Sequence, residues 1–159
     1  MRPSTLALIG LLLTASLPAQ AVLWPSAVLR VERDLHSQDV DVRRRAAQSL
    51  RDLPSGSGTR LASVALDDAD IDVRLSALDA CLSLSLPGLG DRLVPWLTDG
   101  ERRLRLAAAE ALSDSPSLRA VPSLGRALGD TDPGVRSAAA LALGKSAAPE
   151  AALALLGHL

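Results

Sequence analysis

The sequence predicts an all-α protein, an α-solenoid of about four and a half two-helix repeats with a period of 31 residues. Three observations predict this fold. Arg43, Arg74, Arg105 and Arg136 stand 31 residues apart. Apolar residues around each arginine follow helical spacing, and no segment alternates polar and apolar residues as a strand would.

The arginines hold one place in a recurring pattern. Each follows an aliphatic residue, lies three residues before an alanine and seven before a leucine or Cys81. Relative to the arginine, positions −1, +3 and +7 fall on one helical stripe, and the apolar positions −12 and −8 fall on another. Each repeat therefore contains two helices, and the small alanine at +3 lets the second helices of neighbouring repeats pack closely.

Helix boundaries follow from caps and breakers. An acid four residues before each arginine can accept a free amide at a helix start, and Pro133 suits a first helical position. These acids are Asp39, Asp70, Glu101 and Asp132. Loops are expected at Pro54-Ser55-Gly56-Ser57-Gly58, Pro87-Gly88, Ser115-Pro116 and Pro149. The expected helices are 27–37, 40–53, 59–67, 71–85, 90–97, 102–113, 120–129, 133–147 and 150–159.

The first 21 residues are typical of a cleaved signal peptide. Arg2 supplies a positive start, Leu6 to Leu17 a short apolar run, and Ala19-Gln20-Ala21 a cleavage site. A run this short favours cleavage over anchoring, which predicts a secreted or periplasmic protein without a membrane segment after processing. The expected organisation is a signal peptide at 1–21, a linker at 22–27 and a repeat domain at 28–159, with units of about 28–58, 59–89, 90–120, 121–151 and a partial 152–159.

Composition excludes several function classes. The only aromatic residues are Trp24 and Trp96, too few for a base-stacking surface or a ring-lined pocket. The 17 basic and 18 acidic residues give a net charge of −1, so no nucleic acid partner is expected. Cys81 is the only cysteine, lies far along the chain from both histidines, and is expected to be a small core residue.

Unit by unit, the chain resembles the short HEAT-like repeat of the phycobilisome-lyase type, with the pattern D-x-D-P-x-V-R-x-x-A-x-x-A-L. Residues 130–143 match best, 39–50 and 70–81 follow closely, and the third unit departs at Glu101, Arg103 and Leu104. The resemblance covers about residues 28–159 and implies a fold more specifically than a function. One alternative that it implies is a subunit or chaperone of a tetrapyrrole (bilin) lyase-like system.

The four arginines, here called the arginine ladder, lie inside the buried arc of their helices and so require carboxylate partners. Acids at −4, which include Asp39, Asp70 and Asp132, and at −6 are available in the same or the next unit. We expect charge-assisted hydrogen bonds that tie neighbouring repeats together, with phosphate or carboxylate ligand binding as the alternative.

No motif for catalysis, a cofactor or a metal occurs. Neither His36 nor His158 has a neighbouring Glu, and the acid run at 67–72 lacks the glycine and closing Glu of a calcium loop. We therefore expect a protein-protein interaction scaffold and no enzyme.

The expected partner surface lies on the outer arc of the second helices, at +1, +5 and +8, on the concave face of the solenoid. Its residues include Arg44, Arg51, Leu75, Leu82, Leu106 and Leu141, although the leucines could instead pack on an adjacent repeat. Arg44 is expected to be dispensable for stability. Leu155 and Leu159 continue the repeat without a charged cap, so the C-terminal end is expected to self-associate or to continue into further repeats of a longer protein.

Overall fold

The computed structural model describes residues 19–146 and 148–157, with side chains from residue 26 onward. Most of the expected signal peptide lies outside the described residues. The first described helix, α1 (Ala19–Leu35), includes residues 22–27, so the linker expected there is helical in this structure. Ala19, Ala21 and Leu23 are strong helix formers, which favours extension of this element toward the N-terminus.

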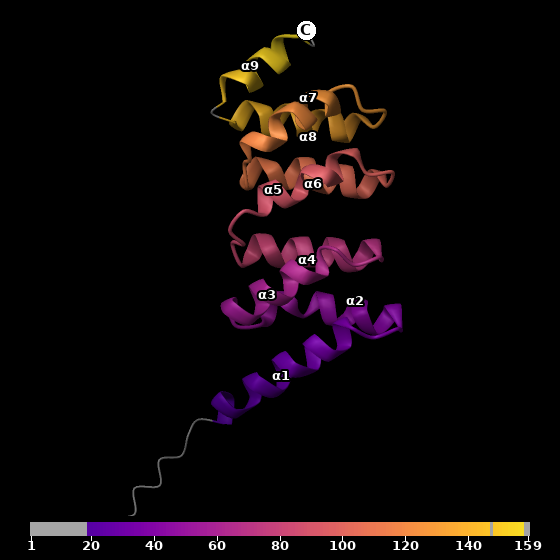
Figure 1. The fold of residues 1–159 in the computed structure, drawn as a ribbon, viewed down its shortest axis with the longest axis vertical. Coiled ribbons are helices and arrows are strands. Elements are labelled where there is room, and N and C mark those ends of the chain that lie inside the picture. Colours follow the sequence, from indigo (N-terminus) through magenta and orange to yellow (C-terminus); the bar gives the residue numbers. More distant parts are fainter. Residues whose placement is uncertain (1–18, 147, 158–159) are drawn as a thin grey trace, which may run out of the picture.

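The described chain is a stack of helical hairpins, which confirms the predicted α-solenoid (Figure 1). First and second helices alternate along the chain, and no strand occurs in the described ranges. After α1 come α2 (Val40–Gln48), α3 (Ser55–Ala65), α4 (Ile71–Ser83), α5 (Leu89–Leu93), α6 (Arg102–Asp114), α7 (Val121–Ala127), α8 (Pro133–Lys145) and α9 (Pro149–Leu156). Short 3₁₀ segments lie at η1 (Leu50–Asp52), η2 (Val94–Thr98) and η3 (Leu118–Ala120).

Aspartates cap three of the four second helices, as the sequence predicts. Asp39, Asp70 and Asp132 each accept a hydrogen bond from a first-turn amide of α2, α4 and α8. Glu101 stands at the same place before α6, but its side chain makes no capping bond. Its longer side chain is a poorer match to the cap geometry than aspartate.

Several helix boundaries differ from the prediction; the helix expected at 90–97, for example, is α5 followed by η2, and two other differences have a clear local cause. The helix expected at 40–53 ends at Gln48, its C-cap residue Ser49 donates a hydroxyl hydrogen bond to the carbonyl oxygen of Ala46, and η1 follows. The loop expected at 54–58 contains the start of α3. A Cβ atom at Gly58 would lie 2.8 Å from Leu84 and 3.0 Å from the carbonyl oxygen of Leu50. This glycine therefore serves close packing between helices and not a flexible turn.

Small residues hold the core of the stack together. The alanines at +3 are buried, with Ala77, Ala108 and Ala139 at 0% exposure. Cys81 is also fully buried, and burial raises the pKa of its thiol to about 11. Both observations fit the expectation of a core built from small apolar side chains.

Replacing Ala108 with Leu is expected to lower the free energy of unfolding by about 1–3 kcal/mol, because three further carbon atoms must enter a filled contact. The matched control is Ala152→Leu, at an exposed position of α9. Urea unfolding of both variants measures the difference. Equal midpoints for the two variants would show that the second helices are not closely packed at this position.

Candidate interaction surface

The arginine ladder joins successive repeats through bidentate ion pairs. Arg43 donates from Nε and Nη2 to Asp68 at 2.9 and 3.3 Å, and Arg105 donates in the same way to Asp130 at 2.7 and 3.1 Å. In both cases the carboxylate lies 25 residues after the arginine, in the following repeat. The partner is thus the acid at −6 of the next unit, while the aspartates at −4 cap helices.

Each of these arginines also binds the loop of its own repeat. Nη1 of Arg43 donates to the carbonyl oxygen of Ser37, and Nη1 of Arg105 donates to that of Asp99. One guanidinium therefore connects two consecutive loops. The side chains of Arg43 and Arg105 are only 17% and 16% exposed, so these pairs are better shielded from water than ordinary surface ion pairs.

Arg44, which the sequence places on the outer arc and predicts to be dispensable for stability, makes a second cross-repeat pair. Its Nε and Nη2 donate to the Asp70 carboxylate at 3.0 and 2.7 Å. This hydrogen bond lowers the pKa of Asp70 to about 2, partial burial opposes the shift, and the backbone amide of Val73 adds to it. Position +1 is thus close enough to the next repeat for a long side chain to reach it.

The junction between the second and third repeats is different. Arg74 approaches Asp99 only to 3.5 Å, its buried Nε has no hydrogen-bond partner in the described part of the chain, and its guanidinium lies 5.8 Å from the ring centre of Trp96. Trp96 stands nine residues before Arg105, where the neighbouring repeats carry Ala65 and Ala127. An indole at the place of a methyl group requires more space between repeats.

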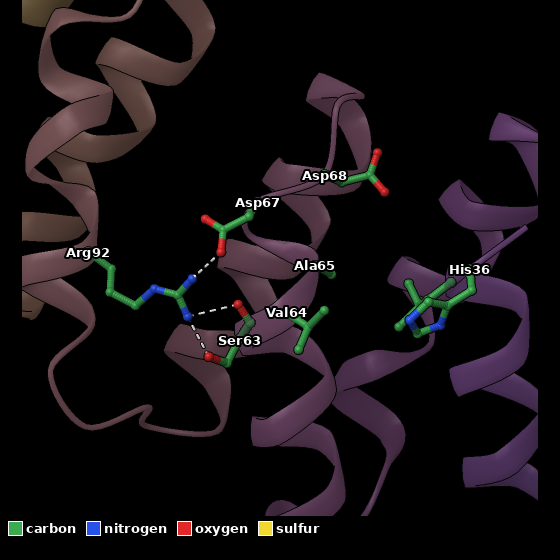
Figure 2. Close-up of a pocket in the computed structure, with 8 residues that line it drawn as sticks. His36, Ser63, Val64, Ala65, Asp67, Asp68 and Arg92 are labelled. Atoms are coloured by element: carbon green, nitrogen blue, oxygen red, sulfur yellow. Dashed lines mark hydrogen bonds and ion pairs between the residues drawn. The ribbon is translucent and has the colours of Figure 1, made fainter. Parts of the chain in front are cut away.

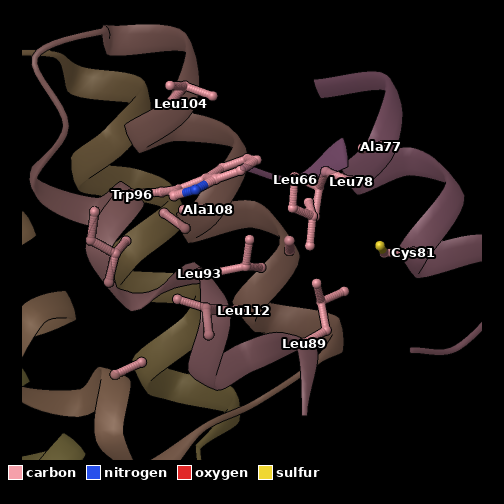
Figure 3. Close-up of a cluster of buried hydrophobic side chains, with 14 of the residues drawn as sticks. Leu66, Ala77, Leu78, Cys81, Leu89, Leu93, Trp96, Leu104, Ala108 and Leu112 are labelled. Atoms are coloured by element: carbon pink, nitrogen blue, oxygen red, sulfur yellow. The ribbon is translucent and has the colours of Figure 1, made fainter. Parts of the chain in front are cut away.

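Trp96 is buried against the third repeat and points toward the second (Figure 3). Its ring lies beside Ala108 of α6 and extends toward Leu66 and Leu78. Leu78 adds further bulk at +4, where the other repeats have alanine. Helices α4 and α6 are accordingly more widely separated than α6 and α8 (Figure 1). We attribute the long ion pair of Arg74 to this spacing.

A groove of about 220 Å³ lies between α4 and α6 on the second-helix face. Its apolar lining comes from Leu75, Leu78, Leu82, Ala107 and Ala111, and its acidic lining from Asp79, Glu110 and Asp114. A second hollow of about 310 Å³ continues over α2 and shares Leu75 and Asp79. The two hollows together extend across three repeats, with the apolar lining between α4 and α6 and the polar side chains of Gln48 and Arg51 on the side of the first repeat.

Three of the six sequence-predicted surface residues line these grooves. Leu75 and Leu82 line the groove between α4 and α6, and Arg51 lines the adjoining hollow, where it pairs with Asp79 at 3.2 Å. Leu106 instead packs across the next junction, against Gly134 of α8. A Cβ atom added at Gly134 would lie 3.6 Å from the nearer methyl group of Leu106. Leu141 is 56% exposed and lies outside the grooves.

The groove residues that sequence reasoning missed include Leu78, Ala107 and Asp114. The available signal was Trp96 at a position of small residues, which indicates a wider junction. A repeat pattern alone predicts the same spacing at every junction between repeats. On that basis these three residues are expected to lie in ordinary helix packing or in solvent.

A pocket of about 480 Å³ lies on the first-helix side, between α1, α3 and α5 (Figure 2). Arg92 reaches from α5 to the carboxylate of Asp67 at 2.6 Å and to both oxygen atoms of Ser63. His36 lies across the pocket and its Nδ1 is 2.7 Å from the carbonyl oxygen of Glu32. These polar groups already bind protein atoms, and Arg92 links the second and third repeats on this side of the stack.

Within the described ranges, no cluster of three or more His, Cys, Asp or Glu side chains could hold a metal ion. Across the same residues, no helix combines the length and hydropathy that crossing a bilayer requires.

Comparisons with known proteins agree with the helical repeat architecture. Residues 90–159 match the family model of HEAT repeats. No curated protein matches the sequence. Two crystal structures of engineered proteins from the Northeast Structural Genomics Consortium are similar, one with 24% identity, a TM-score of 0.59 and coverage of 82% of this chain and 67% of that chain. The other has 22% identity, a TM-score of 0.58 and coverage of 87% and 42%.

The Asp70–Arg44 pair should make stability depend on pH in a defined window. Because the folded pKa of Asp70 is about 2 and its ordinary value is 3.8, the ionised carboxylate stabilises the fold above pH 3.8 and this contribution disappears as the pH falls toward 2. Asp70→Asn keeps a capping oxygen but loses the charge. We expect it to be less stable than the wild type at pH 7 and to approach wild-type stability near pH 2.

The control is Asp52→Asn, because Asp52 is exposed and makes no ion pair among the described residues. Its urea midpoints should follow those of the wild type from pH 7 to pH 2. A constant stability difference between Asp70→Asn and the wild type over that range would contradict the assigned pKa.

Proposed function

We propose that this HEAT-like repeat protein is a protein-protein interaction module that binds an amphipathic helix of its partner in the groove between α4 and α6. Proteins with stacked helical repeats generally use extended surfaces for recognition. The observation that carries the proposal is the wide junction at Trp96, which leaves Leu75, Leu78 and Leu82 lining an open groove on the second-helix face. We propose that this face is concave.

The chemistry of the groove favours a partner helix with an apolar stripe and basic flanks. Three carboxylates line it, and among the described residues two cations pair with them: Arg51 with Asp79 at 3.2 Å and Lys145 with Asp114 at 3.4 Å. All four of these paired side chains are exposed, so the pairs are weak and open to exchange. Glu110 makes no ion pair in the described part of the chain, which leaves one carboxylate available.

A pair of model peptides tests the proposed partner chemistry. One is an amphipathic helix of Leu and Lys, and the other has Glu in place of every Lys. Fluorescence anisotropy should show binding of the basic peptide only. Glu110→Lys should weaken that binding by about threefold, because it reverses the unpaired charge at the groove.

The matched control is Glu150→Lys, an equal charge reversal on exposed α9. It should leave the affinity unchanged. Equal affinity for the two peptides, or equal loss in the two variants, would contradict docking in this groove. Affinity capture with wild-type and Glu110→Lys protein then identifies partners that depend on it.

We also propose that the module acts outside the cytoplasm. This part of the proposal rests on the sequence of residues 1–21 alone, in which a positive start, an apolar run and a small-residue cleavage site follow in order. Cleavage would make Val22 the first residue of the mature chain, which its intact mass would reveal.

A further inference from the structure

The groove between α4 and α6 has two ends that differ in chemistry. Asp72 in the first turn of α4 pairs with Arg103 in the first turn of α6 at 2.8 Å. At the other end, Leu82 near the end of α4 and Asp114 at the end of α6 line the same groove. The two helices therefore run parallel, so one end of the groove lies between their N-termini and the other lies between their C-termini.

The negative charge of the groove is concentrated toward the C-terminal ends of both helices. At the N-terminal end, the charges of Asp72 and Arg103 neutralise each other. The lining begins about one turn further along with Leu75 and Ala107, which are apolar. All three lining carboxylates lie in the second half of their helices: Asp79, Glu110 and Asp114.

The C-terminal turns of α4 and α6 add to this negative charge. The carbonyl groups of a last turn carry partial negative charge, which a basic residue in that turn offsets. Helices α2 and α8 have such a residue, Arg45 and Lys145 respectively. The last turns of α4 and α6 contain none, and α6 ends with Asp114, an acid where a base is favoured. Of the four second helices, the two that border the groove are thus the two without a basic residue in the last turn.

A helix can lie in this groove in either of two directions, and the helix dipole distinguishes them. A helix antiparallel to α4 and α6 places its partly positive N-terminal amides at the acidic end, where basic side chains in its first turns also meet the carboxylates. In the parallel direction its C-terminal carbonyl groups would face the same carboxylates. That repulsion would oppose any attraction that its basic side chains provide.

We propose that the partner helix binds antiparallel to α4 and α6, with a basic N-terminal half beside Glu110 and Asp114 and an uncharged C-terminal half beside Leu75. This inference rests on the proposed function and adds the direction and the charge distribution of the partner helix. The recognised partner is thus an amphipathic helix with Lys or Arg in its first turns.

Two peptides of identical composition test this direction. Each has about 14 residues, close to the length of α4 and α6, with the same stripe of Leu and with acetylated and amidated ends that remove the terminal charges. The first has Lys in its N-terminal half and Gln in its C-terminal half, and the second has the reverse. Fluorescence anisotropy with the full chain should show about threefold tighter binding of the first peptide. Lys near its own N-terminus disfavours the isolated helix, so this preference cannot come from the helicity of the free peptide.

A nitroxide label on the first peptide reports the direction independently of affinity. A label at the peptide N-terminus should broaden the backbone amide NMR signals of Ser113 and Asp114 more than those of Arg102 and Arg103. A label at the peptide C-terminus should give the opposite pattern.

A pair of charge-removing variants tests the acidic end itself. Asp114→Asn should weaken binding of the first peptide about twofold, because it removes one carboxylate beside the peptide N-terminus. The matched control is Glu101→Gln at the other end of α6, where the exposed Glu101 side chain makes no capping bond. It should leave the affinity for the first peptide unchanged.

Equal affinity for the two peptides, tighter binding of the second, or a reversed broadening pattern would overturn the proposed direction. In those cases the groove could still be the binding site, which the response to Glu110→Lys decides. If neither peptide binds, or if Glu110→Lys has no effect on the peptide that does, the proposed function fails and the direction fails with it.

Discussion

The bidentate pair between a ladder arginine and the aspartate of the next repeat is the constraint on which the rest of the structure depends. It fixes two loops to one guanidinium, as Arg105 binds both the carbonyl of Asp99 and the carboxylate of Asp130. Because both loops lead directly into second helices, the pair sets how those helices align. The fully buried alanines at +3 then pack closely only in that alignment.

The proposed interaction surface lies where this constraint is relaxed. At the Trp96 junction the ring occupies space that a methyl group fills elsewhere, and Arg74 reaches its aspartate only at 3.5 Å. Arg74 gains a contact with the Trp96 ring in its place, at 5.8 Å from the ring centre. Trp96 thus both weakens the ion pair at this junction and leaves a groove there. The same residue therefore affects the stability of the junction and the shape of the groove.

Much of the fold could be predicted from sequence because each signal is local. The spacing of Arg43, Arg74 and Arg105 gives the period, and Asp39, Asp70 and Asp132 mark helix starts that the structure has at those places. The candidate surface was harder, because it depends on distances between repeats. The stacking of successive hairpins decides three contacts: Arg44 with Asp70, Leu106 with Gly134, and Trp96 with the neighbouring repeat. The pattern of a single repeat contains no information about this stacking.

A double-mutant cycle on Arg105 and Asp130 tests the central claim most directly. Urea unfolding of Arg105→Ala, Asp130→Ala and the double variant gives their coupling energy, and the same cycle on the exposed pair Arg51 and Asp79 provides the comparison. The account predicts a coupling of about 1–3 kcal/mol for the shielded bidentate pair and a much smaller value for the exposed pair. Additive effects of the Arg105 and Asp130 substitutions would contradict it, because they would show that the repeats are held in register by apolar packing alone.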